Sequence, residues 1–159
     1  MIQMLKANPG FSPCPIQDGD ELYANGIFVF NITKMLAHLQ NNPDGIDLVE
    51  IAVSDFNVQS CIDEAHMKTV DVSLPVVMAE ISPDHYNLID GNHRMEKARR
   101  SGVSKVWAYK FTMPQHISFL TSTKAYLSYV EYWNGKVKQI RRQEELNKQI
   151  PRAVRQRQK

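Results

Sequence analysis

The chain has 159 residues, of which 43% are apolar and 23% are charged, and its formal net charge is +2. These values are typical of one soluble globular domain, and no apolar run approaches the roughly 18 residues that a membrane span needs. The composition therefore excludes an integral membrane protein, and the lack of an apolar signal segment near the N-terminus predicts a cytoplasmic location. Two cysteines are too few for a disulfide-rich scaffold or a cysteine-rich zinc site.

The charges are distributed unevenly along the chain. From Asn134 onward nine basic residues stand against two acidic ones, a net charge of +7, which leaves −5 for the rest of the chain. A basic end is typical of an arm that binds phosphates, so residues 136–159 are a candidate DNA-binding segment. A solvated helix end is the alternative, because the helix dipole also favours cations near a C-terminus.

The hydrophobic periodicity and the turn residues predict a series of short strands and helices. The predicted elements are, in chain order, an irregular lead-in at 1–22, a strand at 26–30, a helix at 32–39 with Asn31 as its N-cap, a strand at 46–53, a short helix at 61–70, a hairpin of strands 74–81 and 85–89, a helix at 95–100 that ends at Gly102, a strand at 105–111, and a helical region from Pro114 to about Lys138. Tyr126, Tyr129 and Trp133 recur at three- and four-residue steps in the last region, which indicates a packed helix face.

This order predicts the α+β fold class, with a small mixed sheet, flanking helices and a C-terminal helical extension. We divide the chain into the lead-in, a domain at 23–113, the helical extension at 114–140 and a basic tail at 141–159.

The residues that indicate chemistry lie in the turn Asp90-Gly91-Asn92-His93-Arg94, between a predicted strand and a predicted helix. Backbone N–H groups at a helix N-terminus attract anions, and Gly91 allows a phosphate to approach the backbone closely. Arg94 offers a planar fork of donors to phosphate oxygens, with His93 as a donor beside it. Asp90 is placed to orient them or to hold a metal ion that accompanies the phosphate. The alternative is a plain turn in which Asp90 caps the helix and Arg94 pairs with a surface acid such as Glu96.

The segment Tyr86–Ala98, with Leu74–Ala79 before it and Gly102–Tyr109 after it, resembles the core of the ParB/sulfiredoxin superfamily over roughly residues 46–111. The resemblance implies a small α+β fold in which this turn binds nucleotide phosphates. The superfamily includes CTP-binding segregation proteins, ATP-using sulfiredoxins, an ADP-dependent serine kinase and ParB-like nucleases.

Differences from these members argue against two of the superfamily's functions, sulfiredoxin chemistry and chromosome segregation. Asn92 occupies the position of the sulfiredoxin cysteine, and an amide cannot act as the thiolate nucleophile. The chain after Phe111 is too short for the two further domains of segregation proteins. The similarity to kinase-type members implies that Glu64, with Asp63 beside it, is the catalytic base. A basic residue contacts a phosphate in some members of the superfamily, and the resemblance implies this role for Lys68. Acids in the first turn of a helix and a solvated lysine are the alternative explanations.

We therefore expect a nucleotide- or phosphate-binding domain that takes ATP, ADP or CTP, with Mg²⁺ held at Asp90, for phosphoryl transfer or nucleotide hydrolysis. Glu64, Asp90 and His93 are the predicted catalytic residues. The predicted phosphate-binding residues are Gly91, Asn92, His93, Arg94 and Lys68. One alternative is a DNA-binding or nuclease-type protein that uses residues 136–159. Another is a non-catalytic interaction module that forms a homo-oligomer through Tyr126, Tyr129 and Trp133.

Overall fold

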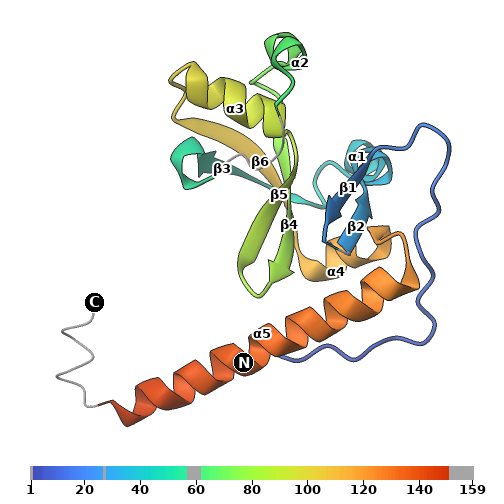
Figure 1. Ribbon diagram of the computed structural model, residues 1–159, viewed down its shortest axis with the longest axis vertical. Helices are drawn as coiled ribbons and strands as arrows, with labels where there is room; N and C mark the ends of the chain where they lie inside the picture. Colours follow the sequence, from blue (N-terminus) through green and yellow to red (C-terminus); the bar gives the residue numbers. More distant parts are fainter. Residues whose placement is uncertain (1, 27, 57–61, 151–159) are drawn as a thin grey trace.

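The computed structural model describes residues 2–26, 28–56 and 62–150. Its elements are β1 (Leu22–Asn25), β2 (Phe28–Asn31), α1 (Ile32–Asn41), β3 (Asp47–Ala52), the 3-10 turn η1 (Val53–Asp55), α2 (Glu64–Thr69), β4 (Val76–Ser82), β5 (His85–Asp90), α3 (Asn92–Arg100), β6 (Lys105–Phe111), α4 (Met113–His116), η2 (Ile117–Phe119) and α5 (Thr123–Gln149) (Figure 1). This content confirms the α+β fold class. None of the helices in these described ranges is both long enough and apolar enough to cross a membrane.

A four-stranded mixed sheet has the order β3-β6-β4-β5. The strands β3 and β6 are antiparallel, as are β4 and β5, whereas β4 and β6 run parallel. Val77 in β4 pairs with Tyr109 of β6 on one side and with Asp90 of β5 on the other. This register places the end of β5, and the turn that follows it, beside the start of the central strand β4.

Both faces of β4 are buried, so the sheet separates two cores. Val77 and Ala79 face the larger core, which contains residues of β2, α1 and α5. Val76 and Met78 face the smaller core, where they pack with Met95 of α3. Alternation along a strand explains this division, since successive side chains point to opposite faces. The helix α3 therefore covers one face of the sheet, and α1 and α5 cover the other.

The buried side of α5 completes the larger core. Tyr126, Tyr129 and Trp133 are 5%, 0% and 6% exposed, together with Val137 at 0%. The prediction that these positions form a packed face is confirmed. The three rings are enclosed within the chain itself and do not form an exposed surface. The alternative of an interaction module stays a prediction.

The segment before β1 lies along α5 (Figure 1). The Asn134 side chain both accepts a hydrogen bond from the Leu5 N–H (2.6 Å) and donates one to the Leu5 carbonyl (2.8 Å). The indole N–H of Trp133 donates to the Gln3 carbonyl at 3.2 Å, and the Phe11 ring stacks on Tyr126 with 4.0 Å between ring centroids. The prediction of an irregular segment before β1 is confirmed. Side chains of α5 form hydrogen bonds with some of its backbone N–H and carbonyl groups.

Most of the predicted elements are present, but several differ in their bounds. The helix predicted at 95–100 begins at Asn92, so the last three residues of the predicted turn form the first turn of α3. Asn31 caps α1 by accepting from the Lys34 N–H at 3.1 Å, and β6 has the predicted bounds. The strand β1 was not predicted, and the helical region after Pro114 is interrupted at 120–122, beyond which α5 continues through the first half of the predicted basic tail. The predicted helix at 61–70 begins at Glu64, and Cys61 lies outside the described residues.

Candidate functional site

A cavity of about 1070 Å³ lies beside the turn that the sequence singled out. One wall is the turn itself, and a second is the segment from α2 to the start of β4. The helix α1 and the strand β1 close the opposite side, while β4, β5 and β6 form the floor. The lining residues include Tyr23, Leu36, Leu39, Gln40, Pro43, His66, Asp71, Val77, Asp90, Gly91, Asn92, His93, Arg94 and Tyr109. All five residues of the predicted turn therefore face one cavity.

The conformation of Gly91 sets the geometry of the turn. Its φ is +98°, a left-handed conformation that favours glycine, and a Cβ at this position would lie 2.6 Å from Val76 Cγ1. The chain turns here from β5 into α3 without an intervening loop. The first intrahelical hydrogen bond is donated by the Met95 N–H to the Gly91 carbonyl at 2.9 Å. The amides of residues 92–94 precede that bond and form the positive end of the helix dipole.

Arg94 lies across the mouth of the turn and forms an ion pair with Asp90. Its Nη2 donates to Asp90 Oδ2 at 3.0 Å, and the two side chains are 19% and 16% exposed. One bond uses a fraction of the five N–H donors of a guanidinium, so the fork retains donors for another anion. The alternative pairing of Arg94 with Glu96 is wrong, because Glu96 accepts from Arg99 and Arg100 instead. Gly91, rather than Asp90, occupies the N-cap position of α3.

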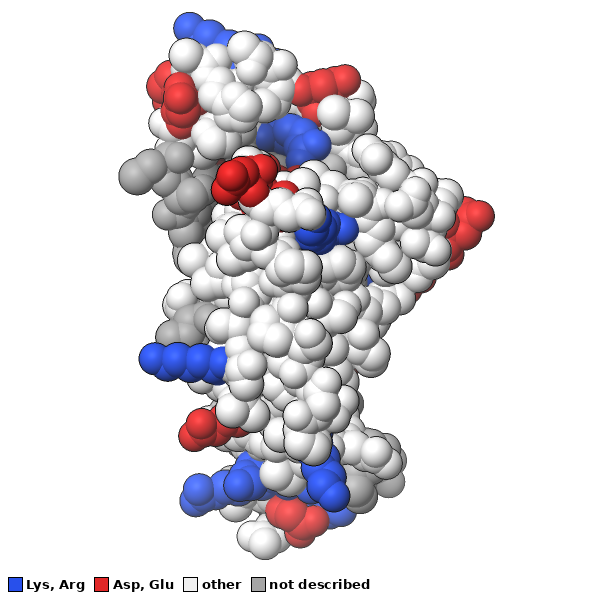
Figure 2. All heavy atoms as spheres, turned by 90° about the vertical axis from the view of Figure 1, so that its right-hand side faces the viewer, with Lys and Arg blue, Asp and Glu red and all other residues white. Residues whose placement is uncertain are grey.

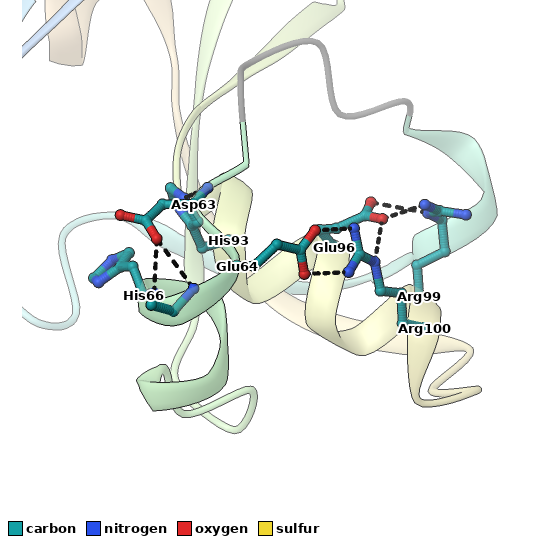
Figure 3. A network of polar contacts seen from close by, with 8 residues as sticks. Asp63, Glu64, His66, His93, Glu96, Arg99 and Arg100 are labelled. Carbon is teal, nitrogen blue, oxygen red and sulfur yellow. Dashed lines mark hydrogen bonds and ion pairs between the residues drawn. The ribbon is translucent and has the colours of Figure 1, made fainter.

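Two imidazole rings lie on the α2 side of the cavity (Figure 3). Nε2 of His93 accepts a hydrogen bond from the backbone N–H of Asp63 at 3.1 Å, so this nitrogen carries a lone pair and the proton of the neutral ring is on Nδ1. The His66 ring meets it edge to face, with 4.6 Å between centroids. The Asp63 carboxylate caps α2 by accepting from the N–H groups of Ala65 and His66. His93 thus joins the start of α3 to the start of α2.

The structure does not bring Glu64 to the cavity. Its two carboxylate oxygens accept from Arg100 Nη1 at 2.7 Å and Nη2 at 3.0 Å, on the side of α2 that faces the end of α3 (Figure 3). This guanidinium lowers the pKa of the Glu64 carboxyl. A carboxylate with a lowered pKa and an occupied pair of oxygens is a poor proton acceptor, so the predicted role of Glu64 as the base has no support in this geometry.

Lys68 is also placed away from the predicted phosphate site. Its side chain is exposed and is not part of the cavity lining. Its backbone carbonyl accepts from Lys97 Nζ at 3.0 Å, and the Val70 carbonyl accepts from the same ammonium at 2.8 Å. The hydrogen bonds of Lys97 therefore connect the end of α2 to α3 and stabilise one wall of the cavity.

The sequence did not predict the remaining lining residues as a site. Asp71 accepts from the N–H and the hydroxyl of Ser73, and these hydrogen bonds lower the pKa of its carboxyl, with Lys97 and Arg94 contributing to the shift. Leu36 and Gln40 reach the cavity from α1, at least 50 residues before the turn. No local spacing relates these positions to the turn, because tertiary packing alone brings them together.

A resident metal site is not preformed in the described ranges, where no three His, Cys, Asp or Glu side chains converge. Mg²⁺ in phosphate sites commonly takes one or two carboxylates together with phosphate oxygens. Asp90 is a carboxylate at the turn that fits this pattern.

The expected DNA-binding segment lies only in part within the described residues. Its first half forms the end of α5, where Lys and Arg side chains gather at the lower end of the molecule with acidic side chains among them (Figure 2). Residues 151–159 lie outside the described ranges.

Comparisons of this chain with models of protein families, with curated proteins and with solved structures find no match. The resemblance of the turn to the ParB/sulfiredoxin superfamily stays a prediction from the sequence.

Proposed function

We propose that this chain binds a nucleotide in the cavity, with a phosphate at the turn Gly91–Arg94. One observation carries the proposal: the N-terminal amides of α3 and the Arg94 guanidinium meet in the wall of the same cavity. Free N–H groups and the helix dipole attract an anion to this end of α3. The guanidinium adds bidentate hydrogen bonds to phosphate oxygens.

The size and lining of the cavity support a ligand larger than phosphate. Its volume of about 1070 Å³ is close to the upper end of the roughly 300–1,000 Å³ typical of small-molecule sites. Leu36, Leu39 and Pro43 make the wall opposite the turn apolar, and Tyr109 contributes an aromatic ring to the floor. A nucleotide has a charged end for the turn and a flat base for the apolar wall.

The reaction class that this arrangement supports is phosphoryl transfer or nucleotide hydrolysis. Arg94 and the amides of the turn are placed to stabilise negative charge on a phosphoryl group. His66, in the cavity wall beside His93, takes the place of Glu64 as the candidate proton acceptor from a hydroxyl group or water. Asp90 would hold Mg²⁺, which when bound to the phosphates neutralises part of their charge.

The test is calorimetry and thermal denaturation with ATP, ADP, CTP and GTP, with and without Mg²⁺, on the wild type and on Arg94→Ala. We expect at least one nucleotide to raise the melting temperature of the wild type, because a ligand that binds the native state stabilises it. Arg94→Ala should remove this shift, since the guanidinium supplies the phosphate contact.

Arg99→Ala is the matched control. Arg99 lies on the same helix, its side chain is 57% exposed, and it contacts Glu96 outside the cavity. Retained binding in Arg99→Ala and lost binding in Arg94→Ala would support the proposal. Equal nucleotide affinity in the wild type and Arg94→Ala would refute the phosphate role, and a wild type that binds none of the four nucleotides would refute the assignment of the ligand.

A further inference from the structure

The outer face of α5, opposite its buried side, carries charges at a regular interval. Lys124, Glu131, Lys138 and Glu145 follow one another every seven residues, and all four are exposed. Seven residues make nearly two turns of an α-helix, so the four side chains lie on one face. Their signs alternate along the helix. Of the four, only Glu145 forms an ion pair within the described residues, with Lys148 Nζ at 3.5 Å.

The alternating charges allow two copies of α5 to pair with opposite charges facing each other, but only when the helices are antiparallel. A second α5 that runs antiparallel, centred between Asn134 and Gly135, places Lys124 opposite Glu145 and Glu131 opposite Lys138. A two-fold axis repeats each contact, so these four residues supply four ion pairs. A parallel pair in register would instead place like charges opposite each other, which destabilises the association.

Gly135 lies near the midpoint of this stretch of α5, at the edge of the charged face, where it also lines a hollow with Phe28 and Ile81. A Cβ built on Gly135 has no heavy atom within 4 Å in the described structure, so the packing of this chain gives no reason for a glycine there. A glycine in the interior of a helix is destabilising relative to alanine. At the crossing point of two helices, the absence of a side chain lets the backbones approach closely.

Two exposed leucines lie on either side of this face. Leu127 and Leu146 are 50% and 46% exposed. In the antiparallel arrangement, Leu127 of one copy and Leu146 of the other lie at nearly the same level along the helices, on opposite edges of the row of charges. Burial of these side chains adds an apolar contribution to the ion pairs. The C-terminal half of α5 extends beyond the sheet and its flanking helices, which leaves room for a second copy (Figure 1).

We propose that the outer face of α5 is the interface of an antiparallel homodimer of this chain. The arrangement leaves the aromatic side of α5 in the core and uses the opposite side for association. Exposed ion pairs contribute little individually and are screened by salt, so the dimer is weak and dissociates as the ionic strength rises.

Sedimentation equilibrium over a concentration series, at low and high salt, tests this interface. At low salt the wild type should show a mass that rises with concentration from 18.3 kDa toward twice that value. Glu131→Lys turns two attractive contacts into repulsive ones and should weaken association by about tenfold or more. Glu131→Lys with Lys138→Glu restores opposite charges across the interface and should restore the dimer.

Glu144→Lys is the matched control, because it makes the same change of charge on another face of the same helix. Circular dichroism of each variant verifies that α5 is intact. A wild type that stays at 18.3 kDa throughout would overturn the proposal. It would also fail if Glu131→Lys and Glu144→Lys weakened association equally, or if the double reversal did not restore it.

Discussion

Substituting alanine for Gly91 should destabilise the domain more than the same substitution at any solvent-facing turn glycine. Two separate effects act at this position. The backbone has φ +98°, and the new Cβ would lie 2.6 Å from Val76 Cγ1 and 2.9 Å from Val76 Cβ. Val76 is 0% exposed and lies in the smaller core, so it has little freedom to move away.

The variant Gly102→Ala measures the effect of the backbone conformation without the steric effect. Gly102 follows the C-terminus of α3 with φ +74°, and a Cβ there meets no atom within 4 Å. The left-handed conformation costs an L-residue roughly 1–2 kcal/mol, and alanine recovers about 0.4–1 kcal/mol by restricting the unfolded chain. Gly102→Ala should therefore lower the free energy of unfolding by about 1 kcal/mol. Gly91→Ala adds overpacking of typically 1–3 kcal/mol, for a total of about 2–4 kcal/mol.

Urea denaturation followed by circular dichroism measures both values. The informative quantity is the difference between the two variants, about 1–3 kcal/mol, because the backbone strain is similar in both. If the two variants lost equal stability, the contact between Gly91 and Val76 would not constrain the turn. A loss of less than about 1 kcal/mol in Gly91→Ala would refute the reasoning as a whole.

Two further changes test the charge of the site and the titration of the core. Asp90→Asn removes a negative charge beside the proposed phosphate and releases Arg94 from its ion pair, so without Mg²⁺ the nucleotide Kd should fall by about tenfold in calorimetry, and a higher Kd would contradict this role. His116 is fully buried, and burial lowers its pKa from 6.5 to about 4. The unfolded chain therefore takes up a proton before the folded one does, and the free energy of unfolding should decrease between pH 6.5 and pH 4 by up to about 1.4 kcal/mol per pH unit. In His116→Asn the free energy of unfolding, measured by denaturation at each pH, should change less between pH 6.5 and pH 4. If it changed as steeply as in the wild type, the effect would belong to other groups.

The sequence predicted the elements whose signals are local. The strand Lys105–Phe111 has turn residues at its start, and the helix Ile32–Asn41 begins at an Asn that caps it. Gly102 ends α3 as expected, with the Val103 N–H donating to the Ala98 carbonyl at 2.9 Å. The prediction missed β1 because its four residues pair only with β2 and have alternating half-burial, which is a weak hydrophobic signal.

The prediction of the site likewise succeeded where the signal was local and failed where it depended on tertiary packing. The turn at Asp90 to Arg94 was found because a glycine, a histidine and an arginine occur within four residues where a strand meets a helix. Glu64 was assigned to the site by resemblance, but Arg100 binds its carboxylate on another side of α2. The sequence could not indicate this pairing, since the two residues are 36 positions apart and their contact depends on how α2 packs against α3.

The two cores differ in how much of the chain must be synthesised before each can form. The buried residues of the smaller core lie between Val53 and Ala108, whereas those of the larger core extend from Phe28 to Val137. During translation, the side of the sheet under α3 has all its buried residues available well before α5 emerges from the ribosome. The hydrogen bonds between Leu5 and Asn134 span 129 residues, so the segment before β1 reaches its final position only after α5 has been synthesised. Until then, the apolar faces of β2 and α1 lack their partner helix and are open to aggregation.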